Sequence, residues 1–434
     1  MKAFRIPTGA CIEGFGDPIG DVLIENCPLR ERQRIAVEEA GLRLEEAAAR
    51  VETGPHLSFN DDLYVSTGML EAFVAEARRS PERPAILGVP RSRETENLSV
   101  TQDAVWQGDA LLYPVRWEVP GSTENPRVIS VDPAEGGFEV KRRIPPHVIE
   151  SGELKLTITR KSIVQIVTPV HLHIANLLSI MNRLASWKPP GLLSVAMRLG
   201  RRFARRPAPG AQPKAPPAAF YSVLRRMNRI GKNCDIHPTA VIEASVIGDN
   251  VRIGAHSYVQ FSNLGDGVTM GPGNIVLTSV IGADTNLVTR EWISLSVVGP
   301  GCFFAPRFIQ FATVGRDAQV YPSMYYDFRL DGKPIQTPFR GRLVDAGTEF
   351  LGPIIGHRAK VAGGLALGPG RMVPNGVTVY PNEATVVNRF PPGLEEGDVI
   401  FAGEKGPQKA AMSTSKPSAS TTVGATIPSR EPST

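Results

Sequence analysis

Two adjacent carboxylates, Asp61 and Asp62, are the first residues of this chain whose type and placement could support chemistry. They lie in the strand-like run LSFNDDLYVS, ahead of the helical pattern TGMLEAFVAEAR. In an α/β sheet, ligands and metal ions bind at the carboxyl ends of strands. The pair therefore predicts a ligand or Mg²⁺ site, with an exposed Asp-Asp helix cap as the alternative.

A fixed repeat in the second half of the chain predicts short strands, which would position a second site. Aliphatic–glycine steps recur every 17 residues, at Ile247, Leu264, Ile281 and Val298, and again after 16 residues at Val314. Apolar residues divide each unit into steps of six, six and five, and pure hexads resume from Ile355 to Val379. This period predicts stacked three-sided coils, a parallel β-helix from about 236 to 386. Four near-equal intervals disfavour the alternative, an irregular β-sandwich.

The repeat is interrupted between Val314 and Ile355. Gly332, Pro334 and Pro338 within this gap indicate a loop that leaves the wall of the β-helix, which we place at 321–347. Long loops on repeat scaffolds often carry function, although an ordered insertion without a role is an equal alternative.

Composition narrows the class of protein. A net charge of +5 with no large basic face argues against nucleic acid as a partner. The four cysteines are scattered without a CxxC pair, which favours reduced thiols over disulfides or zinc. The N-terminus lacks the apolar core of a signal peptide, and no run of about 18 apolar residues occurs. We expect a cytoplasmic protein.

Shifts in composition divide the chain into an α/β domain (1–187), a basic helix with a Pro/Ala linker (188–230), the β-helix (231–396) and a disordered tail (404–434). Within the second segment, GLLSVAMRLGRRFARR at 191–206 combines apolar residues with five arginines. Such a segment is either an interdomain helix or one that contacts an anionic membrane surface.

Several segments carry a family resemblance: Asn26-Cys27-Pro28-Leu29, Asp61-Asp62, Thr168-Pro169 with Ala175-Asn176, Asp331-Gly332-Lys333, and VDAGTEFLGPIIG. Over about residues 10–390 the chain resembles bifunctional N-acetylglucosamine-1-phosphate uridylyltransferase/glucosamine-1-phosphate acetyltransferases. The resemblance implies an α/β nucleotidyltransferase-like (Rossmann-like) domain followed by a left-handed parallel β-helix of hexapeptide repeats. It also implies a homotrimer with acyl-CoA sites between neighbouring β-helices.

The chain departs from this family where nucleotide phosphates would bind. Gly14 and Gly16 occupy the place of the family's Gly-rich phosphate loop, but the Arg and Lys of that loop are missing. A second metal-binding residue before the Thr-Pro pair is also missing, which leaves Asp61 and Asp62 a weak Mg²⁺ site. Negative charge, which repels a triphosphate, stands in the loop instead, at Glu13, Asp17 and Asp21.

The acyl-transfer half departs in a similar way. The window 300–315, where the family has a histidine general base, contains only Arg307 as an ionisable side chain. Arginine stays protonated, so Arg307 is a weak catalytic candidate. His357 is a second one, with an ordinary turn role as its alternative. The loop residues that keep the family's positions and would contact a sugar or phosphate are Tyr326, Asp327 and Lys333.

We therefore expect a transferase-like protein of a sugar-nucleotide pathway, whose ligand is a sugar phosphate or nucleotide sugar. Acyl transfer from acyl-CoA to an amino sugar is favoured over sugar-1-phosphate nucleotidyl transfer. The alternative is a catalytically inactive protein that retains both folds and binds nucleotide sugars or CoA, or acts as a scaffold.

Overall fold

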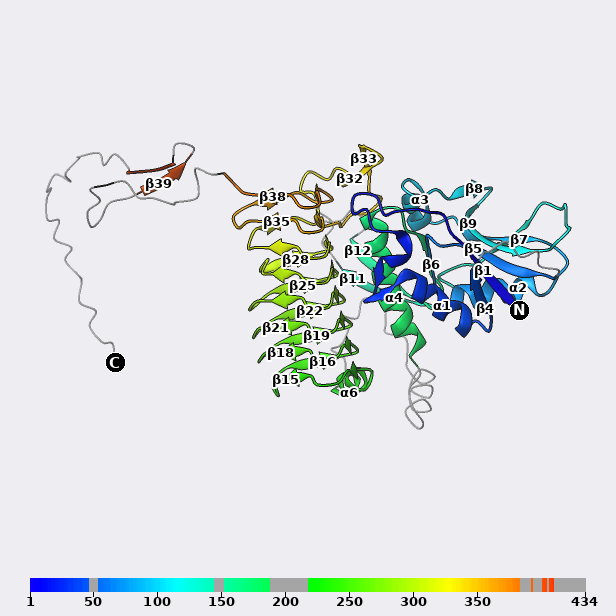
Figure 1. Ribbon diagram of the computed structural model, residues 1–434, viewed down its shortest axis with the longest axis horizontal. Helices are drawn as coiled ribbons and strands as arrows, with labels where there is room; N and C mark the ends of the chain where they lie inside the picture. The colour runs from blue at the N-terminus through cyan, green and yellow to red at the C-terminus, as the bar shows by residue number, and fades with distance from the viewer. Residues whose placement is uncertain are drawn as a thin grey trace, which may run out of the picture. The chain divides into compact units, whose positions relative to one another are not determined.

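The computed structural model describes residues 1–46, 54–143, 152–187, 218–382, 392, 400–403 and 406–409. The chain forms two compact units, Met1–Val379 and Tyr380–Thr434. The first contains an α/β domain followed by a β-helix (Figure 1). In the second, β39 (Ile400–Gly403) pairs antiparallel with β40 (Gly406–Lys409).

A mixed sheet forms the centre of the α/β domain. Its strands are β1 (Lys2–Ile6), β4 (Arg43–Glu46), β5 (His56–Asn60), β7 (Ala85–Pro90), β8 (Val105–Gln107), β9 (Ala110–Glu118) and β10 (Arg127–Ser130). Their order is β10-β7-β9-β5-β1-β4, with β8 beside β9, and only the pairs that include β9 are antiparallel. From β1 the chain moves to β4 on one side and then to β5 on the other. The carboxyl ends of β1 and β5 therefore form a switch point, where α/β sheets bind ligands.

The α/β domain also contains four helices: α1 (Leu29–Glu39), α2 (Thr67–Ala77), α3 (Arg93–Ser99) and α4 (Pro169–Ser186). Ser66 Oγ accepts the Met69 N–H at the start of α2, and Ser92 forms a capping box with Thr95 on α3. Pro169 takes the first turn of α4, where its missing N–H costs nothing. The shorter elements are η1 (Ile19–Asp21), β2 (Leu23–Ile24), β3 (Cys27–Pro28), β6 (Leu63–Val65), β11 (Phe138–Arg143), β12 (Glu153–Ile158) and β13 (Ile163–Gln165).

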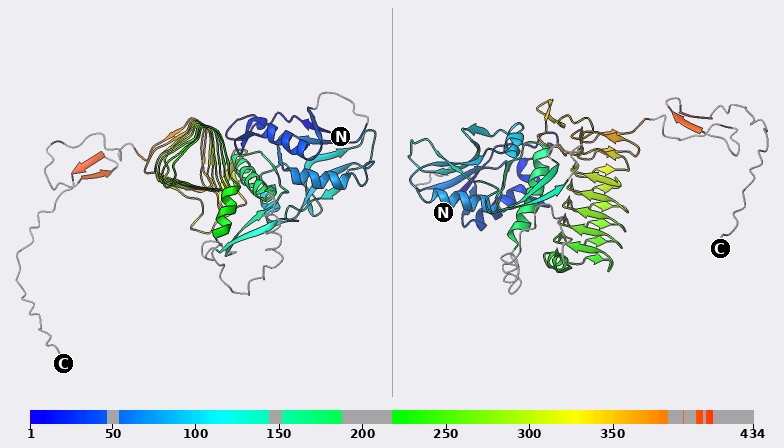
Figure 2. Two further views of the ribbon diagram at one scale, coloured as in Figure 1. Left: turned by 90° about the horizontal axis from the view of Figure 1, so that it is seen from below. Right: turned by 180° about the vertical axis from the view of Figure 1, so that it is seen from behind.

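Three sets of parallel strands form the β-helix, one for each flat side of its coils (Figure 2). Residues 17 positions apart are register partners, as Ile247 is of Leu264 and Leu264 of Ile281. Their side chains belong to one continuous aliphatic core. The predicted fold class, an α/β domain followed by a parallel β-helix, is confirmed. Its left-handed sense stays an implication of the resemblance.

The first side is the covered face, because the α/β domain packs on it. Val280 and Val297 of this face pack with Ile180 and Met181 of α4, and α4 runs beside the coils in Figure 2. Its strands are β14 (Arg229–Ile230), β17 (Val246–Ile247), β20 (Asn263–Leu264), β23 (Val280–Ile281), β26 (Val297–Val298), β29 (Thr313–Val314), β34 (Ile354–Ile355) and β37 (Met372–Val373).

The second side is the polar face, because most of its outward positions are polar, among them Arg252, Asn286 and Lys360. Its strands are β15 (Asp235–Ile236), β18 (Arg252–Ile253), β21 (Thr269–Met270), β24 (Asn286–Leu287), β27 (Phe303–Phe304), β30 (Gln319–Val320), β35 (Lys360–Val361) and β38 (Thr378–Val379).

The third side is the apolar face, built from β16 (Val241–Glu243), β19 (Tyr258–Gln260), β22 (Ile275–Leu277), β25 (Trp292–Ser294) and β28 (Phe308–Gln310). The middle residue of each strand is buried in the coil, so the first residue points outward. Strand β31 (Met324–Tyr325) lies next to β28 and pairs with β36 (Ala366–Leu367). Register therefore stacks one outward apolar ladder: Val241, Tyr258, Ile275, Trp292 and Phe308.

The predicted extruded loop 321–347 contains a β-hairpin. Strands β32 (Gln336–Phe339) and β33 (Arg342–Asp345) pair antiparallel. Between them Arg340 and Gly341 have φ of 48° and 74°, the left-handed values that a tight two-residue hairpin turn requires. The hairpin therefore presents the Arg340 side chain at its tip.

Several predictions concern residues that the structure does not describe. The basic run 191–206 and most of 404–434 lie outside the described residues, so the domain boundaries stay predictions. Helix α6 (Ala218–Arg226) packs against β16 at the first coil. Among the described residues no helix combines the length and apolar character needed to cross a membrane.

Candidate functional site

The hairpin tip of the β-helix reaches the carboxyl edge of the α/β sheet. The Arg340 N–H donates to the Glu13 carboxylate, and Arg340 Nη2 lies 2.5 Å from Asp103 Oδ1. Close approach continues along the hairpin, because a Cβ on Gly347 would stand 2.6 Å from Asn97 Cβ. The second half of the chain therefore contributes a cation to the edge where the first half was predicted to bind its ligand.

Glu13 belongs to a compact turn, residues 12–17, which we call the acidic turn. The Ile12 N–H donates to Asp17 O at 2.9 Å, and the Gly16 N–H donates to Ile12 O at 2.8 Å. Gly14 and Gly16 have φ of 84° and 82°, which favours glycine. These two glycines occupy the place of the family's phosphate loop. A Cβ on Gly14 would stand 2.7 Å from Met372 Cε of the covered face.

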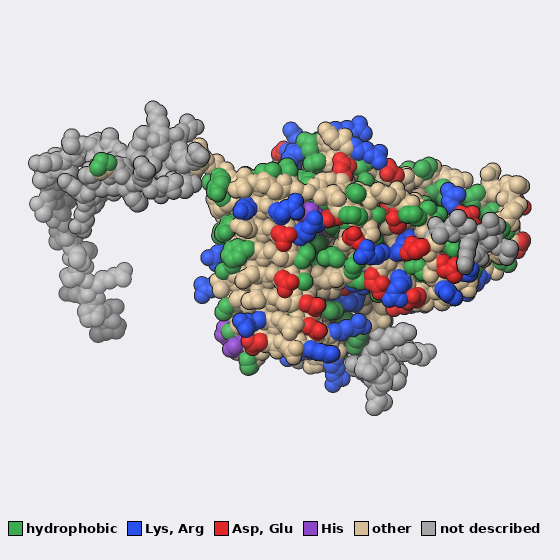
Figure 3. All heavy atoms as spheres, in the orientation of Figure 1, with side chains coloured by type: hydrophobic (Ala, Val, Ile, Leu, Met, Phe, Trp, Pro, Cys, Tyr) green, Lys and Arg blue, Asp and Glu red, His purple; other side chains and the backbone are tan. Residues whose placement is uncertain are grey.

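Asp17 connects the other end of the acidic turn to the β-helix. Its Oδ1 pairs with Arg316, and its Oδ2 lies 2.5 Å from His357 Nε2. Burial alone would raise the pKa of Asp17, but hydrogen bonds from His357 and Arg316 outweigh burial and lower it. Acidic and basic side chains are intermixed on the surface around this junction (Figure 3). Of the acids that replace the family's cations, Asp17 is therefore paired with the β-helix, Glu13 accepts a backbone N–H of the hairpin, and Asp21 pairs with Arg30 inside the α/β domain.

His357, a predicted catalytic candidate, lies within this contact and is only 4% exposed. The Arg316 N–H donates to His357 Nδ1 at 3.0 Å, which assigns the ring proton to Nε2, where it faces Asp17. The ring also lies 4.6 Å from the Phe15 ring. Both nitrogens are engaged within the protein, so this arrangement holds the α/β domain on the β-helix and offers no free lone pair to a substrate.

Asp61 and Asp62 lie at the predicted switch point. Asp61 Oδ1 accepts the Thr8 N–H at 2.9 Å and the Thr8 hydroxyl at 2.6 Å, which connects the ends of β1 and β5. Asp62 Oδ2 accepts from Gln165 Nε2 at 2.7 Å, whereas its buried Oδ1 has no partner. Burial chiefly raises the pKa of Asp62; the Gln165 bond opposes this, and the charge of Asp61 adds to it.

Mg²⁺ at this pair stays a prediction. Gln165 lies just before the Thr-Pro pair, where the family has its second metal-binding residue. Its side-chain amide donates a hydrogen bond to Asp62. In the described part of the chain no three His, Cys, Asp or Glu side chains come together in a metal-binding group. The donor set is therefore two carboxylates, and we derive no metal-dependent step from it.

The three predicted loop residues occupy different environments. Tyr326 and Asp327 follow β31 directly, and Lys333 is exposed before the hairpin. Burial raises the pKa of Asp327 to about 6, and the Asp327 carbonyl accepts the Leu351 N–H at 2.8 Å. Asp327 is therefore a carboxyl group that titrates near neutral pH at the end of the apolar face.

Arg307, the other predicted catalytic candidate, is a corner residue of the coil. Its N–H donates to the carboxylate of Glu291, and its Nη1 donates to Thr289 O at 3.3 Å. Burial raises the pKa of Glu291, while the Arg307 bond acts in the opposite direction. These contacts hold Arg307 in the corner between β27 and β28, against the corresponding corner of the preceding coil.

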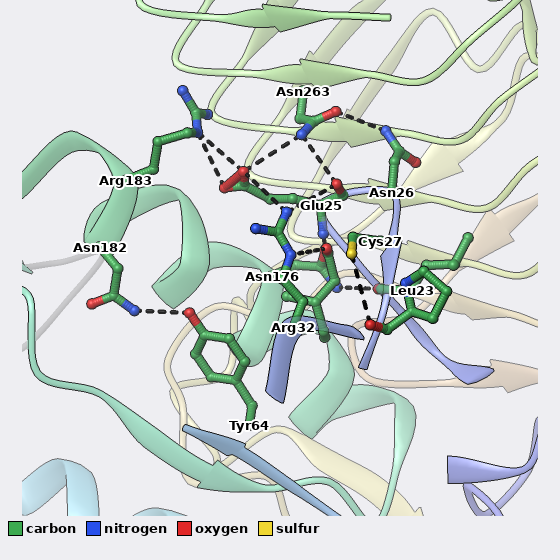
Figure 4. Close-up of polar contacts among 12 residues, drawn as sticks. Leu23, Glu25, Asn26, Cys27, Arg32, Tyr64, Asn176, Asn182, Arg183 and Asn263 are labelled. Carbon is green, nitrogen blue, oxygen red and sulfur yellow. Dashed lines mark hydrogen bonds and ion pairs between the residues drawn. The ribbon is translucent and has the colours of Figure 1, made fainter. Parts of the chain in front are cut away.

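A second contact between the two folds was not predicted (Figure 4). Glu25 and Asn26 form the β2–β3 turn with φ of 46° and 61°. Asn26 Nδ2 donates to Asn263 Oδ1 and Ile281 O on the covered face, both at 2.9 Å. Arg183 Nε of α4 donates to the buried Glu25 carboxylate at 3.0 Å. The Glu-Asn pair signals a tight turn, but no local pattern indicates partners more than 200 residues away.

Asn176, part of the Ala-Asn pair quoted for the resemblance, supports this turn. Its Oδ1 accepts the Glu25 N–H at 2.7 Å, and its Nδ2 donates to Leu23 O at 3.0 Å. Figure 4 shows Asn176 beneath the turn and Asn263 above it. The residue therefore aligns the hairpin that docks on the covered face.

Comparisons with known proteins leave the activity open. A scan against protein-family models and a search of curated proteins both give no match. One of the solved structures that match is the crystal structure of the polysialic acid O-acetyltransferase OatWY, which is 18% identical in sequence. The match covers 36% of this chain and 74% of that chain, with a TM-score of 0.15. A similarity at this level carries no argument about activity.

Proposed function

We propose that the chain is an acyltransferase that moves an acyl group from acyl-CoA to an amino sugar at the apolar face of the β-helix. The apolar face carries this proposal. Trp292 and Phe308 of the ladder and Met324 of the adjoining β31 are 41%, 46% and 59% exposed, and β31 leads directly into Tyr326 and Asp327. Contiguous exposed aromatic surface is costly unless it binds something, and a pantetheine arm or a neighbouring copy would cover it.

Asp327 is the general base of this proposal. A carboxyl with a pKa of about 6 is largely ionised at pH 7 and still basic enough to take a proton. The sugar amine attacks the thioester carbonyl, so a C–N bond forms and the C–S bond breaks. The amine proton passes to Asp327 and then to the departing CoA thiolate. Arg307 and His357 are engaged in structural contacts and take no proton in this scheme.

Turnover of acyl-CoA with a panel of amino sugars and amino-sugar phosphates tests the proposal. We expect Asp327→Asn to lower kcat by about 100-fold with little change in KM, because only proton transfer is lost. Asp331→Asn is the matched control, since Asp331 pairs with Arg329 in the same loop and is exposed. No CoA release above background with any substrate of the panel would refute acyl transfer.

The second candidate is a catalytically inactive protein that binds nucleotide sugars or CoA, or serves as a scaffold. The engaged nitrogens of His357 and the acids of the 12–17 turn favour it. Calorimetry that finds tight binding of a UDP-sugar or CoA without turnover would support it. Loss of a measured activity in Asp61→Asn would exclude it and would favour sugar-1-phosphate nucleotidyl transfer instead.

We also propose a cytoplasmic location and contact of the basic run 191–206 with a membrane surface. Sedimentation with anionic liposomes tests the second: we expect binding that disappears when the five arginines of this run are replaced by glutamine. Equal sedimentation of the two proteins would exclude membrane contact through this segment.

A further inference from the structure

Three phenylalanine rings gather at the corner of the β-helix between the apolar face and the covered face. Phe311, the corner residue after β28, stacks on Phe350 with ring centroids 5.4 Å apart. The Phe350 ring also meets the Phe328 ring edge-on, at 6.3 Å. All three residues are half-buried, so part of the cluster stays accessible to solvent. We call these three residues the aromatic corner.

Asp327 lies at the same corner. The Leu351 N–H donates to Asp327 O at 2.8 Å, and the next N–H, that of Gly352, donates to Phe311 O at 3.0 Å. A Cβ on Gly352 would collide with the backbone of β28, so the close approach of this segment requires glycine. One short segment therefore holds Asp327 and Phe311 side by side and carries Phe350 next to them.

The carboxyl group of Asp327 has no cation of its own. Burial raises the pKa of Asp327 to about 6, and the one opposing influence among the described residues is its own backbone N–H. It forms no ion pair with any described residue, and Arg329, two positions further on, pairs with Asp331 instead. Because a buried charge is costly unless it is paired, an ionised Asp327 favours the arrival of a cationic ligand.

We propose that the aromatic corner and Asp327 form the acceptor subsite of the acyl transfer, and that this subsite selects an amino sugar by its ammonium group over a neutral hydroxyl. The inference rests on the proposed function, because it states which part of the acceptor the same site recognises. Aromatic faces carry partial negative charge and attract cations, and the carboxylate adds a full negative charge. A neutral hydroxyl gains much less from either group.

The proton balance of the reaction accommodates a bound ammonium group. The ammonium loses one proton to solvent before its nitrogen attacks the thioester carbonyl. A C–N bond then forms, the C–S bond breaks, and the second amine proton passes through Asp327 to the CoA thiolate. One ammonium and one thioester therefore give one amide, one thiol and one released proton.

NMR titration of the full-length protein with glucosamine and with glucose at pH 7, without acyl-CoA, tests the subsite. The two sugars differ only in an amine against a hydroxyl at one carbon. We expect glucosamine to bind about 10-fold more tightly than glucose, because only its ammonium group is attracted by the rings and the carboxylate. Asp327→Asn should remove most of this preference.

Phe350→Leu keeps an apolar side chain but removes the aromatic face at the centre of the aromatic corner. We expect this variant to bind glucosamine about 5-fold more weakly and to raise the KM for the amino sugar by the same factor, with kcat and the KM for acyl-CoA unchanged. Phe350→Tyr should restore binding, which separates loss of the ring from loss of packing. Phe303→Leu is the matched control, because Phe303 contacts Tyr321 on the polar face and should keep wild-type affinity.

Two results would overturn the subsite. One is equal binding of glucosamine and glucose by the wild-type protein, or binding of neither. The other is a preference for glucosamine that survives either Asp327→Asn or Phe350→Leu. These titrations contain no acyl-CoA, so they are independent of turnover: a lack of CoA release refutes the reaction, whereas a lack of ammonium preference refutes the subsite.

Discussion

His171 and His173 stand two residues apart on α4, and both are buried. His171 Nε2 lies 2.9 Å from Thr101 Oγ1 inside the α/β domain, whereas His173 Nδ1 lies 3.2 Å from Thr313 Oγ1 of the covered face. Burial lowers the pKa of His171 to about 3 and that of His173 to about 4. Both rings therefore stay neutral in the folded protein at any pH where it is expected to work.

Because both histidine rings are buried and neutral, we expect the free energy of unfolding to fall in acid. The unfolded chain protonates each ring near pH 6.5, whereas the folded protein does so only near pH 4 or below. Stability is therefore lost as the pH falls from about 6.5, down to about 4 for the contribution of His173 and about 3 for that of His171. We expect His173→Gln to remove about 2 kcal/mol of the difference in unfolding free energy between pH 7 and pH 5.

Urea unfolding at the two pH values measures this effect. His256→Gln is the control, because His256 is exposed at a coil corner and should keep the wild-type pH dependence. An equal slope in His173→Gln and wild type would contradict the assignment of acid sensitivity to the buried ring.

At the scale of elements, the β2–β3 turn and the acidic turn attach the α/β domain to the β-helix. Asn26 reaches Asn263 on β20 of the covered face, and Arg340 on the β32–β33 hairpin reaches back to Glu13. The first contact joins the tip of a tight turn to a flat strand, and the second joins the tip of a hairpin to another turn. Both act together with the packing of α4 on the covered face.

Removing the buried amide of Asn263 tests the first contact. We expect Asn263→Ala to lower the unfolding free energy by about 2 kcal/mol. The substitution removes one hydrogen bond from Asn26 Nδ2 and one from the Glu25 carbonyl oxygen. Asn286→Ala on the polar face is the matched control, because Asn286 is also the first residue of its strand, in the next coil, but it is exposed. An equal change in denaturant midpoint for both variants would show that the docking contact contributes nothing.

At the scale of the whole molecule, the three sides of the β-helix differ in what covers them. The covered face carries the α/β domain of the same chain, and the polar face has the composition of a solvated surface. The apolar face is left with its ladder exposed, including Trp292 and Phe308 whose rings lie 6.3 Å apart. A homotrimer, implied by the resemblance, would bury this ladder between copies and place Asp327 beside the joint.

Light scattering tests this assembly. We expect three times the mass of 46.9 kDa for wild type and the monomer mass for Trp292→Glu with Phe308→Glu, because the buried charges would be left unpaired. Thr269→Glu on the polar face is the control and should keep the assembled mass. A wild-type protein that runs as a monomer would remove the trimer and would leave the apolar ladder to a ligand alone.

The β-helix and the strand–helix alternation around Asp61 could both be predicted from the amino-acid sequence alone. Both follow from periods of a few residues, because each coil or helical turn must bury the same side at the same step. The extruded loop was also visible, since it breaks that period. The amino-acid sequence shows that acidic residues replace the family's cations in the glycine loop. It does not show which residues those acids contact.

Only the tertiary structure decided what those acids do. Glu13 meets Arg340 across 327 residues, and Asp17 meets Arg316 and His357 across 299 and 340 residues. Pairings at such separations depend on how two finished folds dock, and no local period encodes them. The same docking decided that both nitrogens of His357 are engaged and that, among the described residues, the α/β domain covers one side of the β-helix and leaves the apolar ladder exposed. The acids therefore signal an intramolecular contact in the folded protein, where the sequence showed only a missing phosphate site.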